Sequence, residues 1–279
     1  MTTISAETVL RSRSTVSGDI LTTLLLRYPR FIHAEFMTHR VFSRNAASSR
    51  AIPVSKLIAD VEDNPAEPLW WGANQPGMQA PRELLDPERD RAIDAWEMAR
   101  LDAISHAKAL ADTGAHKQIV NRLLEPFAHI TTLVSSTEWA NFLHLRDHPD
   151  AEPHMQMLAR EIAQCVESED FVELGVGGWH LPFVSPDERG HSLEALQALS
   201  VARCASTSYK TVDGFDMTLD RAQAVYARLI SSDPMHASPA EHVACVDDGL
   251  YNQLQDRTVF SHPEQHGNFT GFRQLRHML

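Results

Sequence analysis

The sequence has few cysteines and no long hydrophobic run. Its 279 residues include three cysteines, Cys165, Cys204 and Cys245, which are odd in number and too widely spaced for a Cys-x-x-Cys pair. A disulfide framework and a zinc cluster are therefore poorly supported. No apolar run approaches the ~20 residues needed to span a bilayer, and the Ser/Thr-rich segment 1–19 lacks the apolar core of a signal peptide. These absences predict a protein of a reducing, cytoplasmic compartment that does not enter membranes.

Several motifs that mark nucleotide-binding proteins and hydrolases are also missing. There is no Gly-x-Gly-x-x-Gly, no Walker phosphate loop and no Gly-x-Ser-x-Gly elbow. The net charge is -12, and a uniformly acidic surface repels nucleic-acid backbones and anionic membranes. We therefore expect no nucleic-acid partner, although a local cationic pocket for a small phosphate ligand is compatible with this charge. Apolar residues make up 43% of the chain, which is enough for a substantial core.

Hydrophobic periodicity and turn residues predict mostly helix with a minority of strand. The segment 21–36 predicts a strand and then a helix that Pro29 can open, and the β-branched run 127–134 predicts another strand. Helices are expected over 87–111, 116–124, 138–144, 155–166, 193–205, 219–230 and 240–245. Loops are expected over 60–83 and 173–187, a loop or short helix over 43–50, and a tail, 262–279, that folds onto the body. The fold class is α+β.

The first constellation that could carry chemistry is the segment 38–50. It reads Thr-His-Arg-Val-Phe-Ser-Arg-Asn-Ala-Ala-Ser-Ser-Arg, so an acidic protein places three arginines, one histidine and three serines within thirteen residues. The planar guanidinium presents a fork of donors that matches phosphate oxygens. On composition alone, a solvated surface loop explains the segment about equally well.

The second constellation combines 121–126 with 138–147. It contains Arg122, Asn141 and Arg146. Arg146 comes at an expected helix end, where a cation is also favoured for structural reasons, and capping is the better account of it without other information.

The third constellation is 236–242, which reads His-Ala-Ser-Pro-Ala-Glu-His. Ser238 and Glu241 suit a capping box around Pro239, and this structural account is sufficient by itself. The spacing of His236 and His242 around a proline matches no zinc motif, so we expect no metal.

Together these segments resemble the flavin-dependent thymidylate synthases. The family signature is Arg-His-Arg, two residues, Ser, one residue, Asn-Glu, one residue, Ser, one residue, Arg. It is matched by Thr38-His39-Arg40, Ser43, Asn45-Ala46, Ser48 and Arg50. The family's Arg-x-x-x-Pro resembles the segment from Arg122 to Pro126, and its Asn-Phe-Leu-x-Leu-Arg resembles the segment from Asn141 to Arg146.

The order of the blocks and four residues depart from the common form. The Ala-Arg-x-Ser and His-x-Thr-Pro-x-Glu-His segments precede the signature in ordinary members, whereas the similar pieces here, 202–206 and 236–242, follow it. The chain thus resembles a circularly permuted, phage-type form, and permutation is tolerated where termini lie close at the surface. Thr38, Ala46, Glu35 and Ser135 stand where relatives have Arg, Glu, Gln and Asn. Asn268, Gln274, Arg276 and His277 in the tail are candidate substitutes.

The resemblance implies a fold, a reaction and a set of site residues. The fold would be a single domain, 1–279, of mixed helices around a central antiparallel sheet, with signature blocks 29–50, 121–152, 202–206 and 236–242. The reaction would convert dUMP to dTMP with FAD as cofactor and methylenetetrahydrofolate and NADPH as co-substrates, in a homotetramer. Arg146 would be catalytic, and dUMP would be bound by Ser48, Arg50, Arg122 and Arg146. FAD would be bound by His39, Arg40, Ser43, Asn45, Asn141 and His236.

Two other functions remain open at this point. One is a related enzyme that hydroxymethylates or alkylates carbon 5 of a pyrimidine nucleotide. The other is a nucleotide-binding homologue that has lost flavin.

Overall fold

The centre of the protein is a five-stranded sheet. The computed structural model describes residues 3–207, 210–211 and 214–279. The strands are β1 (Ser5–Ser14), β2 (Ile20–Pro29), β3 (Ser43–Ala46), β4 (His129–Ser136) and β5 (Val172–Leu174), in the order β3-β4-β2-β1-β5. All neighbours are antiparallel except β5, which runs parallel to β1. The expected central sheet is present, but it is mixed rather than purely antiparallel.

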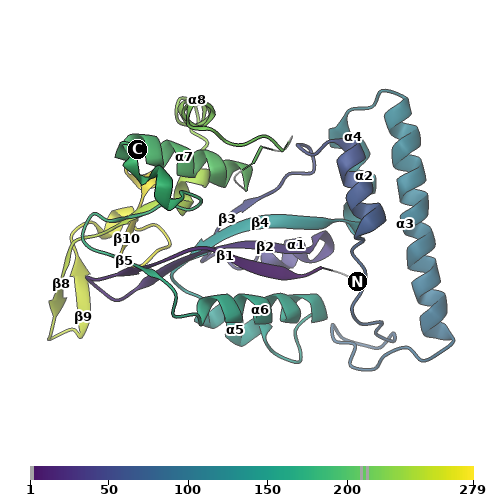
Figure 1. Cartoon of the computed structure of the whole chain (residues 1–279). Helices are drawn as coiled ribbons and strands as arrows, with labels where there is room; N and C mark the ends of the chain where they lie inside the picture. Colours follow the sequence, from purple (N-terminus) through teal and green to yellow (C-terminus); the bar gives the residue numbers. More distant parts are fainter. Residues whose placement is uncertain (1–2, 208–209, 212–213) are drawn as a thin grey trace.

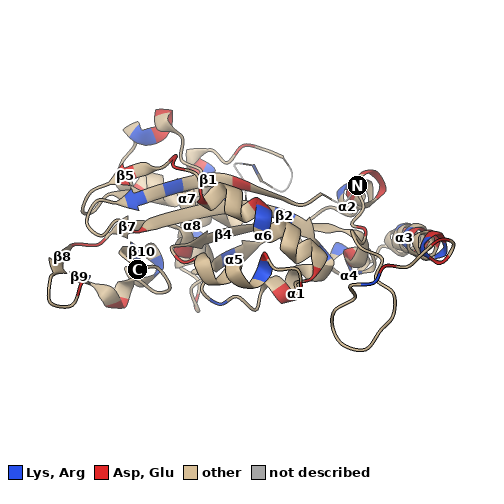
Figure 2. Ribbon diagram, turned by 90° about the horizontal axis from the view of Figure 1, so that it is seen from below, with Lys and Arg blue, Asp and Glu red and all other residues tan. Residues whose placement is uncertain are grey.

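One face of this sheet is covered by α5 (Ala140–Arg146) and α6 (Pro153–Val166), and Figures 1 and 2 both show these helices against the strands. The short α1 (His33–Phe36) joins the same core. Alternate residues of β2 point into it, and Leu24, Leu26 and Tyr28 are fully buried. A strand places every second side chain on one face, so this periodicity gives β2 its orientation and leaves Leu25 and Arg27 for the opposite face.

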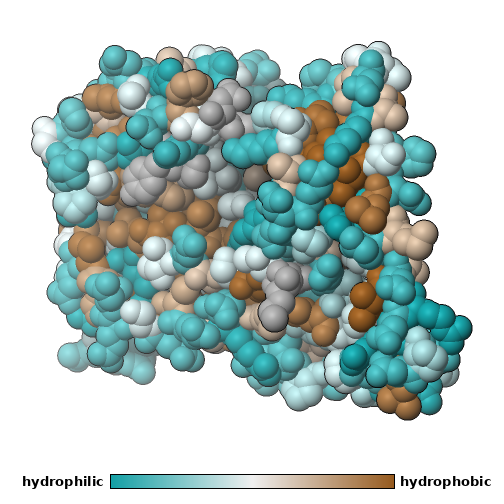
Figure 3. Space-filling view, turned by 45° about the vertical axis from the view of Figure 1, so that its right-hand side comes forward, coloured by the Kyte–Doolittle hydropathy of each residue, from teal (hydrophilic) through white to brown (hydrophobic). Residues whose placement is uncertain are grey.

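The opposite face is covered in two separate places. Over one part lie α7 (Leu193–Ser206) and α8 (Leu219–Ile230); beyond the other lie α2 (Val54–Asp63), α3 (Glu88–Asp112) and α4 (Lys117–Val120). These last helices pack on one another through their own apolar cluster, which includes Leu57, Val61 and Ile104. On α3, acidic and basic residues lie close together (Figure 2), and Figure 3 shows hydrophobic surface in separate patches among hydrophilic residues. A strip of β2 and β4 lies between the two groups of helices.

Small strands complete the C-terminal part. A three-stranded sheet has the order β10-β7-β6, with β6 (Trp179–His180), β7 (Ala244–Val246) and β10 (Phe272–Gln274). The strands β8 (Gly249–Asn252) and β9 (Arg257–Phe260) form a hairpin at the end of the molecule away from α3 (Figure 1). The expectation that the tail folds onto the body is confirmed, because β10 pairs with β7.

Most of the long periodic elements match the expectations, but α2 was not expected, and the loop predicted over 60–83 is wrong over 60–63, which belong to that helix. The expected helices near α3, α6, α7 and α8 and the strands β2 and β4 are all present. The segment 43–50, expected as a loop or short helix, begins with β3, and the expected helix 240–245 is a 3-10 turn, Ser238–His242, followed by β7. The N-terminal segment was not expected to be a strand, yet β1 pairs on both sides. For β1, β3 and β7 the partner strand, rather than the local pattern, decides the conformation.

A buried chain of polar side chains ties the C-terminal segments to the sheet. His180 bonds Ser12 Oγ and Thr23 Oγ1 at 2.8 Å each, Thr23 bonds Ser135 Oγ at 2.6 Å, and Ser135 bonds His242 Nδ1 at 2.8 Å. Burial lowers the pKa of His180 and of His242 to about 3, with the neighbouring His242 adding to the effect on His180. Both rings are therefore neutral, and each joins elements far apart in the sequence.

Candidate functional site

The first group of site residues lies where α5 ends against α1. Arg146 Nε donates a hydrogen bond to His39 Nε2 at 2.8 Å, and Arg146 Nη1 forms an ion pair with Glu35. The His39 ring packs edge-on against Phe142, with centroids 4.9 Å apart. Arg146 is the last residue of α5 and Phe142 lies one turn earlier on the same helix. The helix therefore supplies both the cation and the ring that orients its acceptor.

The protonation state of His39 follows from its surroundings. Burial lowers its pKa, and the nearby Arg146 and Arg44 guanidinium groups lower it further. A neutral imidazole can accept the Arg146 bond through Nε2. Arg146 Nη2 has no hydrogen-bond partner among the residues that the structure describes, and a cavity of about 580 Å³ is lined by Arg146 and Glu35. A fixed guanidinium therefore offers unused donors to whatever enters this cavity, which we call the Arg146 cavity.

The second group lies beyond the other end of β3. Glu125 accepts a hydrogen bond from Ser49 Oγ at 2.7 Å and pairs with Arg122 and Arg30, each at 3.1 Å. The Asn121 amide donates to the carbonyl oxygen of Ser49 at 2.7 Å. These contacts bring the turn 47–50 and the segment 121–126 together within one chain. One carboxylate thus holds two arginines beside the serine-rich turn.

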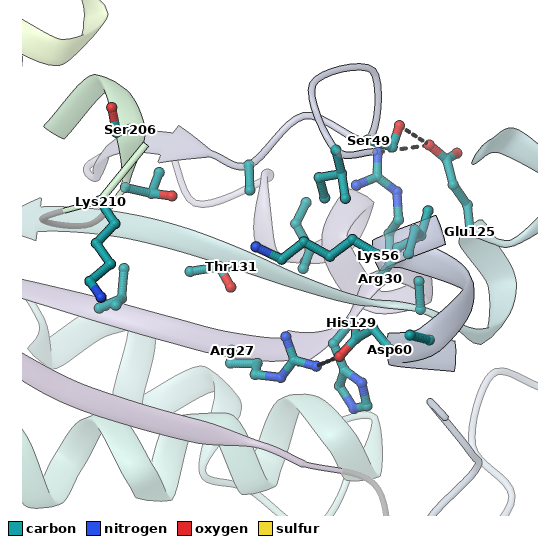
Figure 4. A pocket seen from close by; sticks show the side chains of 18 of the residues that line it. Arg27, Arg30, Ser49, Lys56, Asp60, Glu125, His129, Thr131, Ser206 and Lys210 are labelled. Atoms are coloured by element: carbon teal, nitrogen blue, oxygen red, sulfur yellow. Dashed lines mark hydrogen bonds and ion pairs between the residues drawn. The ribbon is translucent and has the colours of Figure 1, made fainter. Parts of the chain in front are cut away.

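This group borders a cleft of about 600 Å³, which Figure 4 shows. The strip of β2 and β4 forms its floor, and Arg27 on that floor pairs with Asp60 of α2 at 2.7 Å. In Figure 4, Lys56 and Lys210 extend from opposite sides over the strands. Among the described residues that line the cleft, Arg27, Arg30, Lys56 and Lys210 are cations, and Arg30 is held only by a carboxylate that it shares with Arg122, so the cleft offers cationic groups to an anionic ligand.

The remaining residues expected at the site fall into two classes. Ser43 and Asn45 on β3 are engaged: Ser43 Oγ donates to Asn268 Oδ1 at 3.1 Å, and Asn45 Nδ2 donates to the Cys204 carbonyl at 2.6 Å. Arg40, Ser48, Arg50, Asn141 and His236 are exposed, and within the described ranges their side chains form no hydrogen bond or ion pair. The folded chain therefore places the expected site residues in three settings. Some lie around the Arg146 cavity, others lie around the cleft, and His236 lies exposed at the surface.

The residues that depart from the signature have structural roles of their own. Thr38 Oγ1 donates to the Glu35 carbonyl at 2.8 Å, and Ala46 lies in β3 opposite Thr132. Ser135 belongs to the buried polar chain. The tail is in contact with the signature segment, because Asn268 Nδ2 donates to the Val41 carbonyl at 2.6 Å and Asn268 Oδ1 accepts from Ser43 Oγ of β3.

Three charged residues were not expected at the site. Glu35 stands out in the sequence only as a departure from the family, Glu125 belongs to the second constellation without a role of its own, and Arg30 belongs to none. Glu125 could have been found, since it stands three residues after Arg122, a spacing at which helical neighbours meet. Nothing local indicated Arg30, which reaches Glu125 only because the chain turns after β2. Among the described residues, no group of three or more His, Cys, Asp or Glu is arranged to hold a metal ion.

Comparison with known proteins gives one family match. The profile of the family described as thymidylate synthase complementing protein matches residues 12–170, more than half of the chain. No curated protein matches significantly. Two solved structures of the UMP/dUMP methylase PolB from Streptomyces cacaoi, bound with 5-Br UMP and 5-Br dUMP, are similar. They share 16% and 15% identity with TM-scores of 0.49 and 0.48, and each match covers 60% of this chain and 89% or 90% of the other.

Proposed function

We propose that this chain, which belongs to the thymidylate synthase complementing protein family, converts dUMP to dTMP with the help of FAD. The observation that carries the proposal is the fixed Arg146 guanidinium, which keeps free donors at the wall of its cavity. Uracil carbon 5 is a weak nucleophile, and the electron-rich form of the ring that reacts through it carries negative charge on the ring carbonyls. A donor that is already oriented stabilises that charge without reorganisation, which is worth ~3 kcal/mol of barrier. Arg146 is the residue placed to do this.

The nucleotide phosphate would bind beside the cleft of Figure 4. Ser48, Arg50 and Arg122 are exposed there, and Arg122 and Arg30 are held by a carboxylate rather than by a buried network. A phosphate brings more charge and three acceptor oxygens, so it can replace Glu125 as the partner of these arginines.

FAD, when bound, supplies the hydride, after NADPH has reduced it, and methylenetetrahydrofolate supplies the carbon. The residues present fit such a ligand in part: Arg40 and Asn141 are exposed and unengaged within the described ranges, so they can bind a phosphate and a ring or ribose group. His39 would contact the same ligand. Ser43 and Asn45 are already bonded, so they would act by holding β3 in place, and His236 would approach only from the surface.

The permuted order, the single domain over 1–279 and the homotetramer are parts of the same proposal. Two contacts support the first two: the Cys204 carbonyl binds Asn45 of β3, and His242 binds Ser135 of β4. Both late blocks therefore pack on the strands that carry the signature. For the tetramer, in which Arg122 would reach the nucleotide of a neighbouring subunit, light scattering at micromolar concentration is the test, and a monomer mass would contradict it.

A second reaction is favoured by one observation. Thr38 and Ala46 stand where relatives carry a charged Arg and a charged Glu. Thr38 instead donates a hydrogen bond to the Glu35 carbonyl, and Ala46 is an uncharged residue of β3. The altered site could transfer a hydroxymethyl or another alkyl group to carbon 5, and UMP or another pyrimidine nucleotide could be the acceptor.

One experiment separates these functions. The purified protein is examined for the flavin bands near ~450 nm that any oxidised flavoprotein shows, then supplied anaerobically with methylenetetrahydrofolate, NADPH and dUMP or UMP. Mass spectrometry identifies the product. Flavin with dTMP supports the synthase, flavin with a hydroxymethylated product supports the second reaction, and no flavin after reconstitution supports a homologue that only binds nucleotides.

A further inference from the structure

Residues 69–82 form an arm with a fixed shape, which we call the Trp70 arm. Its two sides are joined by backbone bonds from Ala73 N to the Arg82 carbonyl at 2.7 Å and from Leu84 N to the Trp71 carbonyl at 2.8 Å. The Trp70 Nε1–H donates across the arm to the Ala80 carbonyl at 2.7 Å. At the base, Leu69 N donates to His154 Nε2 of α6 at 3.0 Å. The arm is thus closed on itself and attached to the helix that follows α5.

Two glycines make this close approach possible. A Cβ on Gly72 would lie 2.4 Å from the Ala80 Cβ, so no larger residue fits between the two sides without moving them. Gly77 turns the tip with a φ of +98°, a conformation that residues with a Cβ rarely adopt. The arm therefore holds Trp70 and its neighbours in a set position rather than leaving them in a loose loop.

The arm is one wall of the Arg146 cavity. Trp70, Met78 and Pro81 line this cavity together with Arg146 and Glu35. Trp70 is 38% exposed and Met78 is fully exposed, although both side chains are large and apolar. Ligand sites are typically lined by aromatic and apolar side chains together with a few polar groups. Trp70 and Met78 beside the Arg146–Glu35 pair would therefore suit a flat ring with polar edges.

Charge decides which part of a ligand can enter. Of the described residues that line the cavity, three are carboxylates, Glu35, Asp150 and Glu152, and one, Arg146, is a Lys or Arg cation. A phosphate is disfavoured by this excess of negative charge and is better accommodated in the cleft of Figure 4. A neutral lactam ring suits the cavity, because its N–H can donate to a Glu35 oxygen while its carbonyl accepts from Arg146 Nη2.

We propose that Trp70 stacks on the neutral lactam ring of a substrate in the Arg146 cavity, so that the arm selects and orients that ring. The ring is either the uracil of the nucleotide or the pterin of the folate, since both place an N–H next to a carbonyl. The inference depends on the proposed function for the identity of the ring; the stacking itself depends on the arm and the cavity.

Calorimetric titration of the flavin-loaded protein tests this assignment. Wild type, Trp70→Ala and Trp70→Phe are each titrated with dUMP, with tetrahydrofolate and with inorganic phosphate. Stacking on an aromatic side chain predicts that Trp70→Ala weakens one of the two rings ~5- to 100-fold, whereas Trp70→Phe keeps most of the affinity and phosphate binding is unchanged. Loss of dUMP affinity identifies uracil, and loss of tetrahydrofolate affinity identifies the pterin.

A second pair of variants protects the test from a folding defect. Met78 is exposed and makes no hydrogen bond within the described residues, so Met78→Ala should fold and weaken the same ring several-fold. The matched control is Met98→Ala on α3, which is 64% exposed and outside the cavity, and it should change nothing. If Trp70→Ala and Met78→Ala bind both rings as wild type does, or if Trp70→Phe is as weak as Trp70→Ala, the inference is wrong.

The outcomes also separate this inference from the proposed function. Trp70-dependent ring binding without any methylated product would overturn the proposed function and leave the inference in place. Formation of dTMP by a wild type whose ring affinities do not depend on Trp70 would overturn the inference alone. A wild type that binds neither ring would overturn both.

Discussion

The two groups of charged residues beyond the ends of β3 hold their arginines differently. Arg146 is 20% exposed and is bonded from two sides by a neutral histidine and a carboxylate, whereas Arg122 is 55% exposed and shares Glu125 with Arg30. Electrostatic interactions are stronger where water is excluded, so a half-buried guanidinium that two partners orient suits a charge that develops during a reaction. Arg30 is as little exposed as Arg146, at 20%, but it shares its carboxylate with the exposed Arg122, and a shared carboxylate can be exchanged for a ligand that arrives and leaves. The same residue type thus serves chemistry in one place and binding in the other.

The largest expected effect separates these roles through Arg146. Arg146→Ala should lower kcat for dTMP formation ~100-fold, because a preoriented donor to the developing charge is lost. Arg122→Ala is the matched control and should change kcat only a few-fold while raising KM. The comparison would fail if both variants lowered kcat equally in steady-state assays.

Substitutions of Arg30 and of Glu125 at the cleft should change the affinity for dUMP in opposite directions. Arg30→Ala should weaken dUMP binding ~10-fold, since a hydrogen bond to a charged group is worth roughly 1.5–3 kcal/mol. Glu125→Gln should instead tighten binding several-fold, because the carboxylate no longer competes with phosphate. Calorimetry at low and high salt measures both, and the differences should shrink with salt. Weaker binding by Glu125→Gln would mean that the carboxylate positions the arginines rather than competing for the ligand.

A pH profile sharpens the account of the Arg146 cavity. The pKa of His39 is lowered by burial first and then by Arg146 and Arg44, so the folded protein takes up this proton only below the usual histidine range. Protonation would remove the acceptor of Arg146 Nε and place two cations together. We therefore expect kcat to stay level as pH falls to about 6.5, the ordinary histidine pKa, and to drop only at lower pH. His39→Gln should not show this loss of kcat at low pH. A wild-type kcat that already falls above pH 7 would contradict the assignment.

The smallest effect concerns the tail that supports β3. Asn268→Ala removes the hydrogen bond to the Val41 carbonyl and those that Oδ1 accepts from Ser43 Oγ and Gln274 Nε2, although Gln274 Nε2 can still donate to Ser43 Oγ. A typical intramolecular hydrogen bond contributes ~1 kcal/mol net, so the free energy of unfolding should fall by ~1–2 kcal/mol in urea titrations. Asn252→Ala, on the β8–β9 hairpin away from β3, is the control and should leave flavin affinity unchanged. If flavin affinity falls as well, the tail also positions the signature strand for its ligand.

Local patterns were sufficient for most of the long helices and for the residue types of the site. The periodic apolar segments predicted α3, α6, α7 and α8, because a helix repeats its buried face every three to four residues whatever its surroundings. The motif around Ser48, Arg122 and Arg146 pointed to the family that the profile match assigns. Side-chain chemistry alone also indicated that a guanidinium-rich segment in an acidic protein could bind phosphate.

The tertiary structure decided which of those residues meet. β3 is a strand because β4, far along the chain, completes its hydrogen bonds, and no nearby pattern announces this partner. β1 forms a hairpin with the adjacent β2 but also pairs with the distant β5. Glu35 reaches Arg146 across 111 residues of sequence, and Arg30 reaches Glu125 across 95. The sequence by itself determined the family and the kinds of side chain at the site. Only the folded chain decided that one arginine is held rigidly beside a cavity while the others remain exchangeable, because burial and pairing depend on contacts between distant segments.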